Sequence, residues 1–157
     1  MTPATETRRK KILVVDDEKP VRELLKLQLV SAGYEVLLAE DAIVAGRLLH
    51  QASPDLMIVD AHMPYMSGVE FVSTLITDSS MPWVPVIFIT GREELLEHAV
   101  ALGSACLVKP FLSERLIELV ARVLCDPADS RGEAAVADSG SEAAVADPLA
   151  QSRLSAA

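Results

Sequence analysis

One stretch decides the fold: Ile12-Leu13-Val14-Val15-Asp16-Asp17-Glu18, in which four aliphatic residues run directly into three acidic ones. An aliphatic run without alternating polar residues indicates a strand that is covered on both faces, as in a parallel sheet flanked by helices. The acidic residues that follow mark the point where this strand leaves the sheet.

Four further runs of the same kind follow along the chain. They are Val36–Ala39, Leu56–Val59, Val84–Ile89 and Cys106–Val108. Pro85 must lie at the beginning of the fourth run, because proline cannot donate a hydrogen bond to a sheet.

Helical patterns separate these runs. Pro20 lies in the first turn of one that ends near Gly33, Asp41 and Ser67 are candidate N-caps of the next two, and the last two cover Glu93–Leu102 and the residues from Ser113 to Cys125. The β-α alternation occurs five times. The expected fold class is therefore α/β, with a five-stranded parallel sheet at the centre of a three-layer α/β/α sandwich.

Polar residues stand where the expected strands end. Asp16 and Asp17 follow the first run, Asp60 the third, Thr90 the fourth and Lys109 the fifth. Parallel strands bring these residues to one edge of the sheet. Clustered carboxylates suit Mg²⁺, the ammonium can neutralise a phosphate and the hydroxyl can donate a hydrogen bond to it. The sequence thus predicts a phosphoryl-transfer site, where positioning and charge neutralisation are most of the work.

The order and spacing of these motifs resemble the receiver domain of two-component response regulators, over roughly residues 10 to 125. The matching motifs are Val14–Glu18, Asp60–Pro64 with Gly68, Ile89–Gly91 and Leu107–Phe111. The resemblance implies the flavodoxin-like strand order 2-1-3-4-5. It also implies a cis peptide bond between Lys109 and Pro110.

The resemblance further implies a role for each site residue. Asp60 would be the phospho-acceptor, contacted after phosphorylation by Thr90 and Lys109. Asp16, Asp17, Asp60 and the backbone carbonyl of His62 would bind Mg²⁺. The domain would catalyse only its own phosphorylation and dephosphorylation, so it is not expected to be an enzyme in the ordinary sense.

Three positions depart from the family or modulate the site. Cys106 stands where the family commonly has Tyr or Phe, three residues before the lysine, which changes how a signal is passed on. A redox role for Cys106 is an alternative, but apolar surroundings would raise its pKa and make it inert. His62 and Arg92 flank the expected phosphate, and Arg92 is a candidate to pair with it or to shield it from water.

The domain organisation follows from composition. We expect a flexible segment at 1–10, a receiver domain at 11–126 and an Ala-rich acidic tail at 127–157. The tail repeats Glu-Ala-Ala-Val-Ala-Asp at 133–138 and 142–147. Its composition favours disorder. The alternative is a docking peptide anchored by Val136 and Val145.

The charge balance constrains the partners. A net charge of −9 argues against DNA binding, and no segment resembles a DNA-binding output domain, so we expect a stand-alone receiver that signals by protein contact. The expected partners are a sensor histidine kinase or histidine phosphotransfer protein, and a downstream protein target. A degenerate receiver, which binds partners without phosphorylation, is the alternative; a flavodoxin-like cofactor binder lacks a glycine-rich phosphate loop.

The expected location is the cytoplasm. The chain shows no signal-peptide pattern and no apolar run long enough to cross a membrane. Its two cysteines have no spacing typical of a disulfide framework or a metal site.

Overall fold

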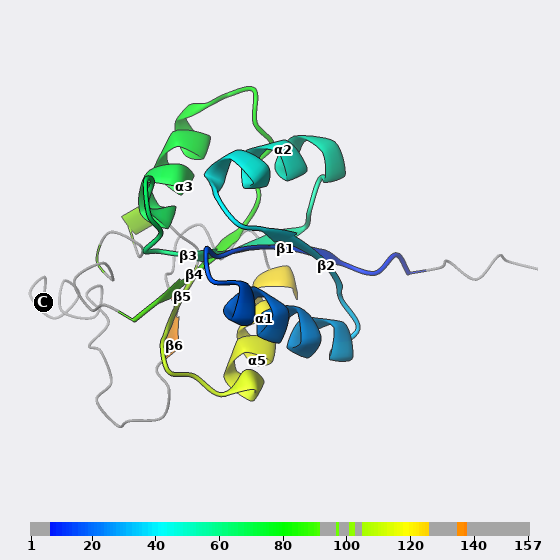
Figure 1. Cartoon of the computed structure of the whole chain (residues 1–157). Coiled ribbons are helices and arrows are strands. Elements are labelled where there is room, and N and C mark those ends of the chain that lie inside the picture. Colours follow the sequence, from blue (N-terminus) through cyan, green and yellow to red (C-terminus); the bar gives the residue numbers. More distant parts are fainter. Residues whose placement is uncertain (1–6, 92–96, 98–100, 103–104, 126–134, 138–157) are drawn as a thin grey trace, which may run out of the picture.

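A parallel sheet forms the centre of the molecule in the computed structural model, which describes residues 7–91, 97, 101–102, 105–125 and 135–137 (Figure 1). Its strands lie in the order β2-β1-β3-β4-β5-β6, and all neighbours are parallel. The bounds are β1 Lys11–Val15, β2 Glu35–Ala39, β3 Leu56–Asp60, β4 Val86–Thr90, β5 Ala105–Val108 and β6 Ala135–Ala137. The expected order 2-1-3-4-5 is confirmed, and Pro85 lies just before β4 as predicted.

Helices cover both faces of the sheet. They are α1 Lys19–Ser31, α2 Ala42–Ala52, α3 Gly68–Thr77 and α5 Ser113–Cys125. Figure 1 shows α2 and α3 on one side of the sheet and α1 and α5 on the other. This is the expected three-layer sandwich. The expected helix Glu93–Leu102 lies largely outside the described residues; Glu97, Ala101 and Leu102 within it are helical.

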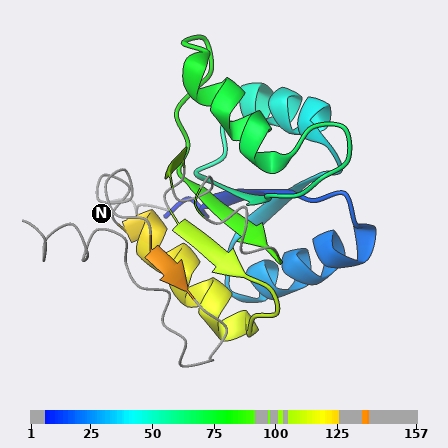
Figure 2. The ribbon, with the colours of Figure 1, turned by 90° about the vertical axis from the view of Figure 1, so that its left-hand side faces the viewer.

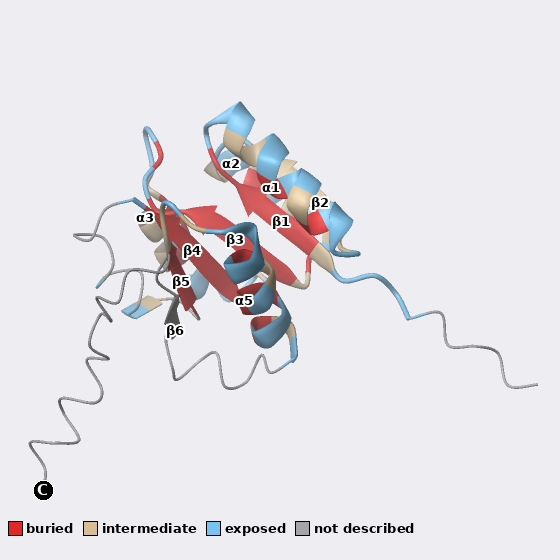
Figure 3. Cartoon of the chain, turned by 90° about the horizontal axis from the view of Figure 1, so that it is seen from below, coloured by how far each residue is buried: buried red, intermediate tan, exposed pale blue. Residues whose placement is uncertain are grey.

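Successive residues of the strands β1 to β5 contribute to two separate cores. In β1, Leu13 and Val15 belong to the cluster under α2 and α3, whereas Ile12 and Val14 belong to the cluster over α1 and α5. This alternation explains why the strand sequences are aliphatic throughout: both faces are buried, as Figure 3 shows along the sheet.

Capping residues set where the helices begin. The carboxylate of Asp41 accepts a hydrogen bond from the Val44 backbone N–H at 2.8 Å. Ser67 and Glu70 form a reciprocal capping box at the start of α3. Both caps were predicted from the sequence, as was Pro20 in the first turn of α1.

The N-terminal segment contacts the domain before β1 begins. The guanidinium of Arg8 forms an ion pair with Asp55 at 3.0 Å, and the Lys10 carbonyl accepts a hydrogen bond from the Glu35 N–H at 3.0 Å. The expected flexible segment 1–10 is therefore anchored at these two residues, while residues 1–6 lie outside the described part of the chain.

The sixth strand was not predicted. Residues Ala135–Ala137 come from the tail expected to be disordered, and they pair with β5 at the edge of the sheet (Figure 2). The remainder of the tail lies outside the described residues. No helix among the described residues is long and apolar enough to cross a membrane.

Candidate phosphoryl and metal site

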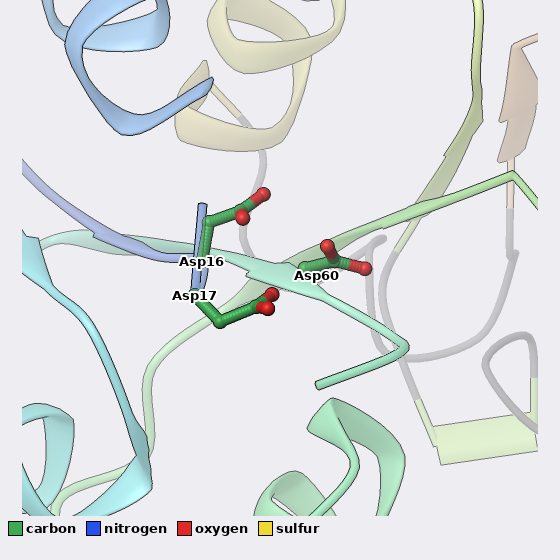
Figure 4. A group of neighbouring side chains, drawn as sticks. All are labelled: Asp16, Asp17 and Asp60. Atoms are coloured by element: carbon green, nitrogen blue, oxygen red, sulfur yellow. The ribbon is translucent and has the colours of Figure 1, made fainter. Parts of the chain in front are cut away.

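Three carboxylates meet at the carboxyl ends of β1 and β3 (Figure 4). One oxygen from each of Asp16, Asp17 and Asp60 lies within 4.8 Å of the others. Strand order explains this meeting: the chain passes from β1 outward to β2 and then returns to β3 on the other side of β1. Ligand sites of doubly wound sheets lie at such a reversal, beyond the carboxyl ends of the strands.

Asp16 is buried, with only 1% of its surface exposed. Its Oδ1 accepts a hydrogen bond from the Glu18 N–H at 2.9 Å, but its buried Oδ2 has no hydrogen-bond partner. The pKa of Asp16 is raised to about 6, chiefly because burial disfavours the ionised carboxylate. The nearby Asp60 and Asp17 also raise this pKa, whereas the Glu18 N–H and Lys109 lower it. Crowding of negative charge thus destabilises the ionised form of Asp16 when no cation is bound.

Arg22 holds the backbone at Asp16. Its guanidinium donates a hydrogen bond of 2.7 Å to the Asp16 carbonyl from the first turns of α1. The sequence analysis did not single out Arg22. Its position on the helix that follows Asp16 and Asp17 was the available signal, but only the path of the chain between β1 and α1 brings it to this carbonyl.

Asp60 ends β3 and is 6% exposed. Its Oδ1 accepts a hydrogen bond from the His62 backbone N–H at 2.9 Å, and its Oδ2 accepts one from Lys109 Nζ at 3.4 Å. Lys109 Nζ also lies 3.9 Å from Asp16 Oδ2, too far for a hydrogen bond but close enough for charge attraction. One ammonium therefore faces two of the three carboxylates.

The remaining strand-end residues surround this group. Thr90 is fully buried at the end of β4, and its register partner on β5 is Val108, directly before Lys109. The Lys109 N–H donates to the Thr90 carbonyl at 2.8 Å, so the two residues are joined through the backbone. The peptide bond between Lys109 and Pro110 is cis, as the family resemblance implied.

The three positions expected to modulate the site differ in their relation to it. His62 approaches it through its backbone N–H, and its side chain is exposed. Cys106 is fully buried in β5, and burial raises the pKa of its thiol to about 12, which agrees with the expected inert thiol. Arg92 lies outside the described residues. Both cysteines are free.

The acidic residues fit a small divalent cation. Mg²⁺ typically takes one or two carboxylates, keeps several waters and needs oxygen ligands. The buried Oδ2 of Asp16, which has no hydrogen-bond partner, is available as such an oxygen ligand. A buried carboxylate oxygen without a partner is energetically costly unless a cation compensates its charge. Asp17, which is exposed, leaves the site open to solvent.

Comparisons with known proteins agree with this fold and site. Residues 12–121 match the family described as the response regulator receiver domain. The phosphate regulon transcriptional regulatory protein PhoB of Pseudomonas aeruginosa is 34% identical over 132 residues, which cover 81% of this chain and 58% of that protein. The chain therefore spans little more than half of that relative.

Two solved structures are similar over almost their whole length. The chemotaxis response regulator CheY4 of Vibrio cholerae is 34% identical with a TM-score of 0.67, and the match covers 73% of this chain and 98% of that one. The response regulator TrrA of Thermotoga maritima, solved in complex with Mg²⁺ and BeF, is 32% identical with a TM-score of 0.66 and the same coverages.

The doubly wound parallel sheet is of the flavodoxin-like class, and the acidic cluster lies at its switch point. The chain belongs to the response regulator receiver domain family and is a receiver domain of two-component signal transduction. This confirms the family inferred from the motifs. The degenerate alternative finds no support in a site that retains its full acidic cluster.

Proposed function

We propose that Asp60 accepts a phosphoryl group from a phosphohistidine partner, with Asp16 and Asp17 holding Mg²⁺ beside it. The observation that carries the proposal is the position of the Asp60 carboxylate. It ends the central strand β3, shares a cluster with two other carboxylates and has Lys109 Nζ 3.4 Å from its Oδ2. A nucleophile, a cation site and a fixed ammonium are thereby combined in one place.

In the proposed transfer, the phosphoryl group moves from the histidine nitrogen to a carboxylate oxygen of Asp60. A carboxylate oxygen of Asp60 attacks phosphorus, the phosphorus–nitrogen bond of the phosphohistidine breaks, and the imidazole leaves with its electron pair. Bound Mg²⁺ would neutralise charge on the phosphoryl oxygens. When the phosphoryl group binds, the Lys109 ammonium exchanges its contact with the Asp60 carboxylate for a contact with a phosphoryl oxygen. Thr90 would donate a hydroxyl hydrogen bond to another phosphoryl oxygen, and the His62 carbonyl would be a further ligand of the cation.

Hydrolysis would return the domain to its resting state. Water attacks phosphorus and the Asp60 carboxylate leaves. We propose that Arg92, two positions beyond Thr90, pairs with the phosphoryl group or shields it from this water. An Arg92→Ala variant should then lose its phosphate faster than the parent, and an unchanged dephosphorylation rate would remove Arg92 from the proposal.

Partners and location follow the same proposal. The donor is a sensor histidine kinase or a histidine phosphotransfer protein in the cytoplasm. The output is contact with a downstream protein, since the acidic net charge of −9 does not favour DNA.

Intact-mass spectrometry tests the central step. The protein is incubated with acetyl phosphate, with and without Mg²⁺, and we expect a gain of one phosphoryl mass that requires both Mg²⁺ and Asp60. Asp60→Asn should show no gain, while Asp78→Asn, which changes an exposed aspartate beyond the end of α3, should behave as the parent. If neither acetyl phosphate nor a panel of phosphohistidine donors labels the protein, the degenerate interaction module replaces this proposal.

A further inference from the structure

The edge of β5 carries a strand that belongs to the tail of the same chain. Ala135, Val136 and Ala137 pair in parallel with Ala105, Cys106 and Leu107 (Figure 2). Helix α5 lies between the two strands in the sequence, so β5, α5 and β6 continue the β-α-β alternation of the domain. Segments separated by about thirty residues are thereby joined through main-chain hydrogen bonds.

β5 is buried as an interior strand would be. Ala105, Cys106 and Leu107 are each at most 1% exposed. The strand at the opposite edge, β2, is only partly buried at Val36 and Leu37. A short apolar edge strand with free N–H and C=O groups is a template for further pairing, and proteins normally cover or charge it. The tail strand covers it here.

The covered strand leads directly to the candidate phosphoryl site. Leu107, the last residue of β5 paired with the tail, is two positions before Lys109. On the other side of β5, Val108 pairs with Thr90, and the Lys109 N–H donates to the Thr90 carbonyl. The docked tail therefore restrains the strand that places the Lys109 ammonium against Asp60.

We propose that the β5 edge is a docking site for the tail strand Ala135–Ala137, and that docking opposes phosphorylation of Asp60. The recognised chemistry is an extended segment of small residues bound by its backbone. In the docked state Lys109 Nζ contacts the unmodified Asp60 carboxylate, a contact that an incoming phosphoryl group must replace. Coupling of this kind is reciprocal, so phosphorylation would also weaken docking. The coupling, unlike the docking, rests on the proposed function.

The duplicated hexapeptide provides a matched control. We would compare the double variant Ala135→Pro/Val136→Pro with Ala144→Pro/Val145→Pro, which makes the same change in the second copy of Glu-Ala-Ala-Val-Ala-Asp. Two consecutive prolines are needed because neighbouring residues of a strand direct their N–H groups to opposite edges, so one proline must fall on the β5 side.

Hydrogen exchange of the β5 amides in the full-length protein tests docking. Among the amides of Ala105–Val108, we expect those that face the tail strand to exchange at least about tenfold faster in the 135/136 variant than in the parent, with no change in the 144/145 variant. Equal exchange in all three proteins would overturn the docking site. Acceleration in both variants would overturn the assignment to the first copy.

Labelling by acetyl phosphate then tests the coupling on the same proteins. We expect an initial rate about fivefold higher in the 135/136 variant, at the lower end of typical coupling between sites. An equal or lower rate, with faster exchange in β5, would overturn the coupling and leave the docking. If the parent itself is not labelled by any donor, the proposed function fails and the exchange result still decides docking.

Discussion

At the scale of single residues, the main feature of the site is an excess of negative charge. Three carboxylates lie together against one ammonium, and the most deeply buried of them, Asp16, has an oxygen with no hydrogen-bond partner. Such an arrangement is costly in isolation and becomes favourable when a cation arrives. On the proposed function, these unfavourable interactions would favour the binding of a cation at the site.

The raised pKa of Asp16 predicts how metal binding depends on pH. Below its folded-state pKa of about 6, Asp16 carries a proton that a cation must displace. We therefore expect Mg²⁺ affinity to fall by up to about tenfold per pH unit below 6. Isothermal titration with Mg²⁺ at several pH values checks this. Asp16→Asn should bind weakly at every pH with a much flatter profile, and a flat profile in the parent would contradict the assignment.

The same pKa shift predicts the direction in which the stability of the metal-free protein changes with pH. The pKa of Asp16 is higher in the folded state, about 6, than its ordinary value of 3.8, so the folded state binds the proton more tightly. The contribution of Asp16 to the free energy of unfolding is therefore greatest below the lower value and declines as pH rises towards the higher one. Urea unfolding in chelator should show a smaller decline for Asp16→Asn than for the parent over this window.

Gly68 is where the loop after Asp60 approaches the backbone most closely. A Cβ at this position would lie 2.7 Å from Val59 Cγ1 and 2.9 Å from the Asp60 carbonyl carbon, and it would also clash with the Asp60 carbonyl oxygen. Gly68→Ala should thus destabilise the domain by at least about 2 kcal/mol, because backbone atoms cannot easily move away.

Gly46 provides the control for this substitution. It lies within α2, where an added Cβ would meet nothing within 4 Å. Gly46→Ala should stabilise the protein by about 0.5–1 kcal/mol, as expected for a helix interior. Urea unfolding of the two variants should give opposite signs, and a Gly68→Ala protein as stable as the parent would contradict the close approach.

At the scale of elements, α2 and α3 each begin where a short polar side chain accepts a hydrogen bond from a backbone N–H that has no partner within the helix. Ser67 accepts from the Glu70 N–H at 3.1 Å, while the Glu70 side chain accepts from the Ser67 N–H at 3.3 Å. This box fixes the start of α3 and so the end of the loop that leaves Asp60. The strands need no comparable device, because burial on both faces holds them.

Removal of the cap gives a prediction for α3. Ser67→Ala should lower the free energy of unfolding by about 1 kcal/mol, since the Glu70 N–H loses its acceptor. Ser73→Ala, within the same helix, should change stability by no more than about 0.5 kcal/mol. Urea unfolding of both variants checks this, and equal effects would show that the cap contributes nothing.

At the scale of the whole molecule, two cores on opposite faces share one sheet, and the candidate cation site lies at the carboxyl ends of its strands. A cation that binds only the folded state stabilises it by mass action. At a Mg²⁺ concentration one hundred times its dissociation constant, the gain should be about 2.7 kcal/mol, with a rise of several degrees in Tm.

Thermal unfolding with increasing Mg²⁺ measures this effect. Asp17→Asn should lose most of the rise at the same concentrations, because it removes an exposed ligand with little cost to the fold. Asp78→Asn should keep the whole rise. A Tm that rises equally in Asp17→Asn and in the parent would mean that the cation binds elsewhere.

Much of the site was predictable because its signals are local. Each strand-end residue follows an aliphatic run directly, and the parallel arrangement brings all of them to one edge. The caps at Asp41 and Ser67 were predictable for the same reason. Arg22 and the contacts of Lys109 with two carboxylates were not, because they depend on distances between elements that no local pattern records.

The sequence by itself determined the three-layer fold, the strand order through its family motifs, and the gathering of Asp16, Asp17 and Asp60. Aliphatic runs that end in polar residues indicate strands covered on both faces, with their polar ends gathered at one edge of a parallel sheet, which leaves few topologies. Only the tertiary structure decided that Asp16 keeps an unpartnered oxygen and that Ala135–Ala137 adds to β5. The physical reason is that both features depend on residues that are distant in sequence and close in space. The surrounding residues decide whether a buried oxygen finds a hydrogen-bond donor, and a neighbouring strand decides whether an Ala-Val-Ala segment becomes a strand.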